Sequence, residues 1–167
     1  MNTPAADDAD PGFELVPDPP PVARRARLPR WVRGTLALMA VGFAAVFGIA
    51  LGLNPYKPDG TRRDMATHTQ LGLPPCTMVQ VFGKPCPSCG MTTSFALLAH
   101  GDVAGSLKAN WVGTLLAGYW FALIPWAAAG AWRGRYPWVR SGELLLTLSV
   151  AVVLVLLLIR WTVVMLL

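Results

Sequence analysis

The residues that could perform chemistry are three cysteines and one histidine. Cys86 and Cys89 form a Cys-x-x-Cys pair, while Cys76 and His68 precede them in the same segment. Proline is favoured at the first position of a helix, so the sequence predicts a helix that starts at Pro87, with Cys86 near its cap. Both sulfur atoms would then lie beside the unpaired N–H groups and the positive dipole of the first turn, which favour the thiolate.

Three uses of these sulfur atoms are open. A structural disulfide could join Cys86 to Cys89, or Cys76 to either of them, and would leave one cysteine over. A metal could be bound by the ligand set of a Cys₃His zinc site, formed by Cys76, Cys86, Cys89 and His68, so zinc is the candidate cofactor. A thiol redox role is the third use, because Cys-Pro-x-Cys at a helix start is similar to thioredoxin-type sites, although no βαβ pattern surrounds it.

The elements that must position these residues are apolar helices. The chain has 167 residues, of which 54% are hydrophobic and only 14% charged, as is typical of a membrane protein. About 20 apolar residues span the hydrocarbon core of a bilayer, and three segments meet this requirement, at about 35–53, 109–132 and 143–165. The third contains Arg160, whose long side chain could extend to the interface. The sequence therefore predicts an all-α membrane protein with three transmembrane helices.

A shorter helix is predicted at about 87–99. Its length of about 20 Å is too small to cross the bilayer, so we expect a re-entrant or interfacial half-helix with Thr92 and Thr93 on its polar side. Gly101 and the residues around it break this helix. Asp102 is a favourable N-cap for a following helix that continues through Asn110 into the second span.

The charges predict the domain organisation and the orientation. Residues 1–33 form an acidic, proline-rich head without order and a basic flank, and residues 34–167 form the membrane domain. Five arginines precede the first span and three follow the second, namely Arg24, Arg25, Arg27, Arg30 and Arg33, then Arg133, Arg135 and Arg140. The positive-inside rule therefore places the N-terminus in the cytoplasm and the cysteine segment and C-terminus outside. The net charge of +5 is explained without nucleic acid, and the lipid bilayer is the expected partner.

The motif Cys86-Pro87-Ser88-Cys89-Gly90-Met91-Thr92-Thr93, followed by Gly101-Asp102 and Asn110, resembles a bacterial family of small multi-span membrane proteins of unknown function. Members show Cys-Pro-x-Cys-Gly-x-Thr, then Gly-Asp, then an Asn before a hydrophobic span. The resemblance covers about residues 68–130. It implies a membrane protein of undetermined biochemistry and supplies no activity. Within it, the residues expected to form a structural motif are Pro87, Gly90, Thr92, Thr93, Gly101, Asp102 and Asn110, and we expect the membrane to be the bacterial inner membrane.

Together these observations favour a non-catalytic assembly or interaction module. Its functional surface would be an extracytoplasmic cysteine loop held by a disulfide, and another membrane protein is a candidate partner. The zinc-binding module and the membrane thiol-disulfide redox protein are the alternatives. The sequence predicts no catalytic residue, because it contains no paired acidic dyad and no Ser-His-Asp arrangement.

Overall fold

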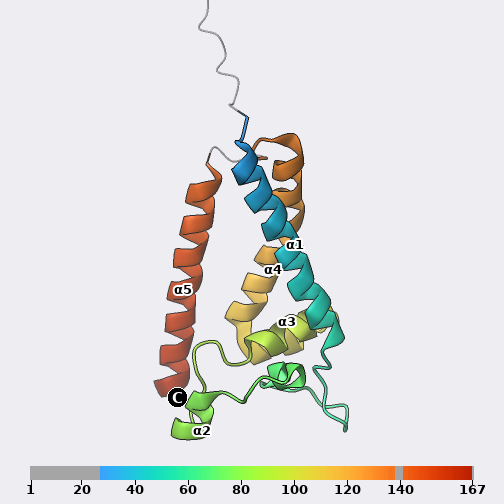
Figure 1. Cartoon of the computed structure of the whole chain (residues 1–167). Coiled ribbons are helices and arrows are strands. Elements are labelled where there is room, and N and C mark those ends of the chain that lie inside the picture. The colour runs from blue at the N-terminus through green and yellow to red at the C-terminus, as the bar shows by residue number, and fades with distance from the viewer. Residues whose placement is uncertain (1–26, 138–140, 167) are drawn as a thin grey trace, which may run out of the picture.

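A computed structural model describes residues 27–137 and 141–166, and this part of the chain is helical without any strand (Figure 1). In order, the elements are α1 (Arg30–Gly52), the 3₁₀ helix η1 (Thr67–Leu71), α2 (Thr77–Phe82), α3 (Met91–Ala99), α4 (Val103–Arg133) and α5 (Gly142–Leu166). The predicted all-α class is confirmed.

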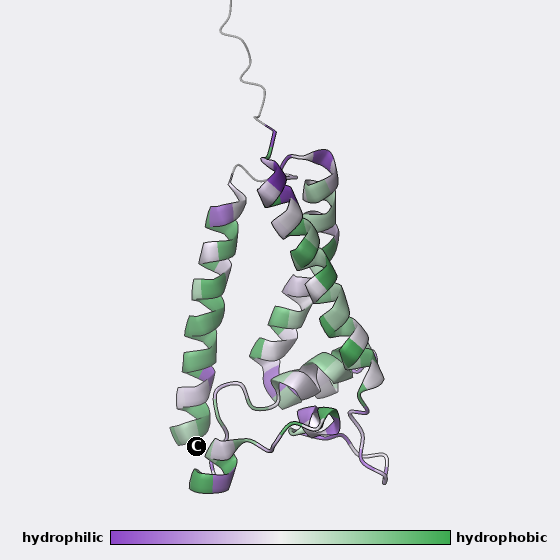
Figure 2. Cartoon of the chain, viewed as in Figure 1, coloured by the Kyte–Doolittle hydropathy of each residue, from purple (hydrophilic) through white to green (hydrophobic). Residues whose placement is uncertain are grey.

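The helices α1, α4 and α5 are long and apolar enough to cross a membrane. Figure 2 shows that hydrophobic residues dominate all three. In α5, Leu148, Val152 and Leu158 are 56–57% exposed, which a bilayer would tolerate because its acyl chains cover apolar surface in place of water. The three helices coincide with the three predicted spans, apart from their exact ends.

Two apolar clusters join the helices. Near one end of α1, Leu36 and Ala40 pack with Ala127 of α4. Near the other end, Ala50 of α1 and Ala117 of α4 pack with Phe95 of α3. The helix α3 therefore lies across the ends of α1 and α4, whereas α5 stands apart from α1 and makes only sparse contact with α4 (Figure 1).

The start of α4 agrees with the sequence prediction. The carboxylate of Asp102 accepts a hydrogen bond of 2.9 Å from the Gly105 N–H, as expected of an N-cap. The preceding Gly101 ends α3 with a left-handed φ of +83°. The helix α4 is not regular throughout, because Asn110 has φ −161° and ψ 100°. This break separates a short first segment from the long apolar one.

The short helix starts later than predicted. Its first residue is Met91, and the preceding residues form two turns in which Cys89 N–H donates to Cys86 C=O (3.1 Å) and Met91 N–H to Ser88 C=O (3.0 Å). Gly90 has φ +81°, which a right-handed helix does not allow. The interpretation that Cys86 and Cys89 lie at the first turn of a helix is therefore wrong.

Candidate metal centre

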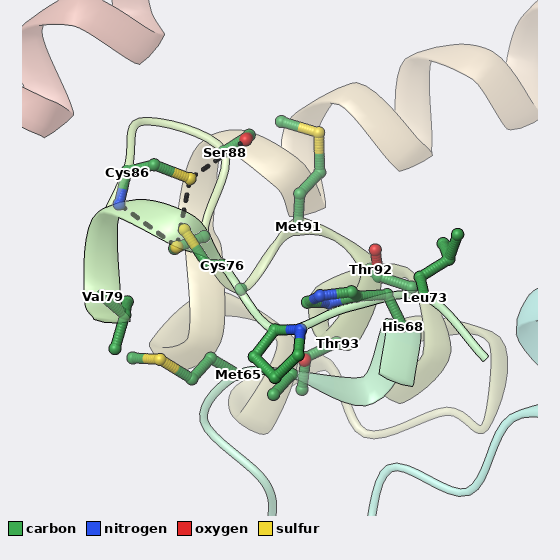
Figure 3. A pocket seen from close by; sticks show the side chains of 14 residues that line it. Met65, His68, Leu73, Cys76, Val79, Cys86, Ser88, Met91, Thr92 and Thr93 are labelled. Atoms are coloured by element: carbon green, nitrogen blue, oxygen red, sulfur yellow. Dashed lines mark hydrogen bonds between the residues drawn. The ribbon is translucent and has the colours of Figure 1, made fainter. Parts of the chain in front are cut away.

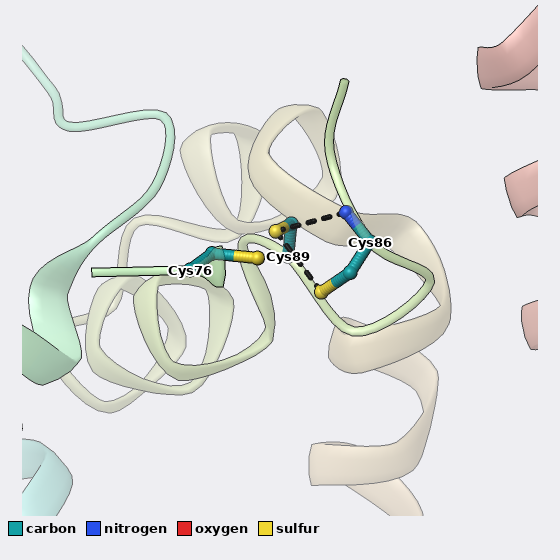
Figure 4. Close-up of side chains that lie close together, drawn as sticks. All are labelled: Cys76, Cys86 and Cys89. Atoms are coloured by element: carbon teal, nitrogen blue, oxygen red, sulfur yellow. Dashed lines mark hydrogen bonds between the residues drawn. The ribbon is translucent and has the colours of Figure 1, made fainter. Parts of the chain in front are cut away.

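The three cysteines converge on one point (Figure 4). Their sulfur atoms all lie within 4.8 Å of one another, and those of Cys86 and Cys89 are 3.1 Å apart. Cys76 comes from the N-cap of α2, and the other two come from the turns before α3. No disulfide joins these three residues in the structure. The turn after α2 thus returns the chain to Cys76 and completes the cluster.

Asn110 holds the Cys89 turn in place from α4. Its side-chain amide donates to the Cys89 carbonyl (3.1 Å), and its side-chain carbonyl accepts from the Gly113 N–H (3.0 Å). Asn110 is fully buried, and a buried amide is stable only when its polar atoms are paired. The break in α4 therefore has a role, because it turns the Asn110 side chain toward the cysteine turn.

Arg160 of α5 reaches the same place. Its guanidinium donates to the carbonyls of Pro87 (3.4 Å) and Ala109 (3.3 Å). Ala109 directly precedes the break in α4, so its carbonyl lacks a regular helical partner. The sequence analysis did not include Arg160 in the site. The available signal was a charged residue within an apolar span, which usually has a specific partner or a function.

The cysteines differ in how readily they ionise. The Val79 N–H donates to the Cys76 sulfur and lowers the pKa of Cys76 to about 7. Burial raises the pKa of Cys89 to about 12. The cysteine with the favourable position at a helix start is therefore Cys76, not the pair for which the sequence predicted it.

A cavity of about 460 Å³ opens beside the sulfur atoms (Figure 3). The fourth predicted ligand, His68, lines this cavity, but its Nε2 atom lies 3.2 Å from the Pro74 carbonyl and the imidazole does not join the sulfur cluster. The structure therefore brings together three of the four predicted metal ligands and places the fourth on the cavity wall.

The threonines of the motif also lie at the cavity. Thr92 and Thr93 both line it. Thr93 is fully buried, and its hydroxyl lies 2.8 Å from that of Thr67 in η1. This contact attaches η1, and with it His68, to α3.

The sulfur geometry is compatible with a single metal ion. Zinc–sulfur bonds of about 2.3 Å place the sulfur atoms of a tetrahedral site about 3.8 Å apart. The separations here extend from 3.1 Å to at most 4.8 Å, on both sides of this value. Small rotamer changes would therefore suffice to close three thiolates around one ion, or to bond Cys86 to Cys89.

Comparison with protein-family models fits the expected similarity to a family of unknown function. A family model described as "Protein of unknown function (DUF2752)" matches residues 76–124. The comparisons with curated proteins and with solved structures gave no match. The matched segment begins at Cys76 and ends within α4, so it contains all three cysteines and Asn110. It is similar to a family of unknown function, and this similarity assigns no activity.

Proposed function

We propose that this protein is a membrane-anchored, non-catalytic metal-binding module whose three cysteines hold one thiophilic metal ion. The observation that carries the proposal is the convergence of all three sulfur atoms within 4.8 Å. A disulfide uses two cysteines and leaves the third without a role. A metal centre uses all three, including Cys76, which lies outside the Cys-x-x-Cys pair.

The charges around the site support this proposal. Cys89 is half-buried, so its thiolate form would need a nearby cation, and a bound metal ion would supply one because a coordinating thiol is deprotonated outright. The Arg160 guanidinium, which is bonded to the Pro87 carbonyl, would partly balance the negative charge of a metal–thiolate cluster. His68 is the candidate fourth ligand and would first have to leave the Pro74 carbonyl.

Titration with Cd²⁺ tests the proposal, because Cd²⁺ binds thiolates and its charge-transfer absorbance reports each sulfur bond. We expect the reduced full-length protein in detergent to bind one Cd²⁺ per chain through three thiolates. Cys76→Ser should weaken binding at least tenfold and lower the absorbance by about a third. Thr77→Ala is the matched control, since it changes the neighbouring residue without removing sulfur. Stoichiometric uptake that Cys76→Ser leaves intact would contradict the proposal, as would no uptake.

A disulfide-held interaction module is the second candidate, in its purely structural or its redox form. The separation of 3.1 Å between the Cys86 and Cys89 sulfur atoms favours it, because loss of two electrons and two protons would join them with little movement. Cys76 would then remain a thiol. This candidate differs from the first in the number of thiols that are free before reduction.

We further propose that the cysteine cluster lies outside the bacterial inner membrane and that the N-terminus lies in the cytoplasm. The arginines before α1 and after α4 support this orientation. A membrane-impermeant maleimide should therefore label the cysteines of metal-depleted protein in intact cells. A cysteine placed by Arg135→Cys in a chain with its native cysteines replaced should react only after permeabilisation. The reverse pattern would invert the orientation. A need for reductant before labelling would favour the disulfide candidate.

A further inference from the structure

All three cysteines lie on the wall of one cavity. Cys76, Cys86 and Cys89 each line the space of about 460 Å³ beside the sulfur cluster (Figure 3). Two other residues of its wall, Met65 and Leu73, are 41% and 52% exposed, so the cavity is accessible from outside. An ion held by the three sulfur atoms would therefore border a space that a small molecule can enter.

The cluster supplies three ligands, whereas a tetrahedral ion such as zinc takes four. Within the described residues, only the three cysteines come together as ligands. His68 could supply the fourth only after its Nε2 atom leaves the Pro74 carbonyl, from which it lies 3.2 Å away. Three protein ligands beside a cavity are the arrangement in which a molecule from solution takes the fourth position.

The walls of the cavity indicate the class of that molecule. Most of the side chains beside the sulfur atoms are apolar, namely Met65, Leu73, Pro75, Val79 and Met91. Among the described residues, no aspartate, glutamate, lysine or arginine lines the cavity, and its hydroxyls are those of Ser88, Thr92 and Thr93. Mainly apolar walls with a few polar groups, around a space of about 300–1,000 Å³, are typical of small-molecule sites. The cavity therefore fits an uncharged, largely apolar body.

We propose that the cavity binds a small apolar thiol whose sulfur atom occupies the fourth position on the ion. This inference rests on the proposed metal-binding function and adds a ligand to the same site. Thiolate sulfur is a donor that a thiophilic ion prefers, and the apolar walls receive the rest of the molecule. On binding, the thiol releases its proton to solvent and its sulfur replaces a water molecule. The four ligands are then the three cysteines and the thiol, and His68 stays at the Pro74 carbonyl.

Titration of the Co²⁺-loaded, full-length protein in detergent with benzyl mercaptan tests the inference, because the charge-transfer absorbance of Co²⁺ reports its thiolate bonds. The titration is anaerobic. We expect one benzyl mercaptan per chain and a rise of about a third in this absorbance, as three sulfur bonds become four. Mercaptosuccinate, which carries a thiol on a charged body, should bind at least about tenfold more weakly.

Two leucine variants show whether the thiol lies in this cavity. Leu73→Asn should weaken benzyl mercaptan binding about tenfold, because it places an amide in the apolar wall, and should leave Co²⁺ affinity unchanged. Leu71→Asn is the matched control, since Leu71 is 49% exposed but does not line this cavity. His68→Ala should leave the Co²⁺ spectrum without thiol unchanged, because the histidine is not a ligand.

Four results would overturn the thiol site while cysteine-dependent Co²⁺ binding still supports the proposed function. They are an unchanged or lost Co²⁺ spectrum on addition of benzyl mercaptan, equal binding of the two thiols, equal losses in the two leucine variants, and an altered thiol-free spectrum in His68→Ala. Absence of cysteine-dependent Co²⁺ binding would overturn both the thiol site and the proposed function.

Discussion

Gly90→Ala is expected to destabilise the fold by about 2–5 kcal/mol, a large part of the 5–15 kcal/mol that ordinarily separates folded from unfolded states. Gly90 has φ +81°, a conformation that costs other residues about 1–2 kcal/mol. A Cβ atom there would also lie 2.5 Å from the Ala109 carbonyl oxygen and 3.1 Å from that of Asp64. Both neighbours are main chain and cannot rotate away, and overpacking of this kind costs about 1–3 kcal/mol. Thermal unfolding in detergent, followed by circular dichroism, measures the loss.

Gly101→Ala is the matched control for this variant. Gly101 has nearly the same φ of +83°, but a Cβ atom there would meet nothing within 4 Å. It should therefore show only the conformational cost of about 1–2 kcal/mol. Equal losses in the two variants would mean that the approach of the Gly90 turn to α4 contributes nothing to stability.

The Gly90 turn, the break in α4 and α5 meet at one carbonyl. The Ala109 oxygen lies where a side chain at position 90 would have to fit, and it also accepts a hydrogen bond from Arg160. The next residue, Asn110, bonds the Cys89 carbonyl. The segment before α3 is thus anchored through its main chain from both α4 and α5. The Gly that follows the second cysteine and the Asn before the span therefore serve the same purpose, which is to seat the cysteine turn on α4.

The sequence predicted the long helices well because their signal is local. An uncharged apolar run of sufficient length specifies a spanning helix, whichever partner it packs against. The Asp102 cap is equally local, since a carboxylate three residues before a free N–H is enough to form it. These features needed no knowledge of the tertiary structure.

The sequence could not predict the completed site because that depends on packing. Proline is only statistically preferred at the start of a helix. At Pro87 the chain instead forms turns that end at Gly90, and the helix begins at Met91. The proximity of Cys76 to the pair requires the reversal of the chain after α2. The partners of Arg160 lie 51 and 73 residues away in the sequence. The residue types alone identified the candidate metal ligands, but the positions of these ligands in space could be known only from the tertiary structure.

The proposed metal centre, if occupied, is expected to control the order of α2. This helix has six residues and none of them is buried, and its last residue, Phe82, is 68% exposed. Without a core of its own, α2 depends on Cys76 for its attachment. A ligand at 100 times its dissociation constant stabilises the bound state by about 2.7 kcal/mol, which lowers the open population about a hundredfold. Chymotrypsin should therefore cleave after Phe82 about a hundred times more slowly in Cd²⁺-loaded protein than in metal-free protein, as followed by mass spectrometry of the fragments.

The same cleavage distinguishes the two candidate functions, because each anchors Cys76 differently. In the metal centre, a chelator removes the protection of Phe82 and a reductant alone does not. Cys76→Ser should be cleaved quickly even with metal present. A disulfide between Cys86 and Cys89 would leave Cys76 unattached, so that α2 is cleaved rapidly under all conditions. A disulfide from Cys76 to either partner would give protection that a reductant, and no chelator, abolishes. The rate of cleavage after Phe82 therefore distinguishes three states of the sulfur atoms: a bound metal ion, a disulfide between Cys86 and Cys89, and a disulfide that includes Cys76.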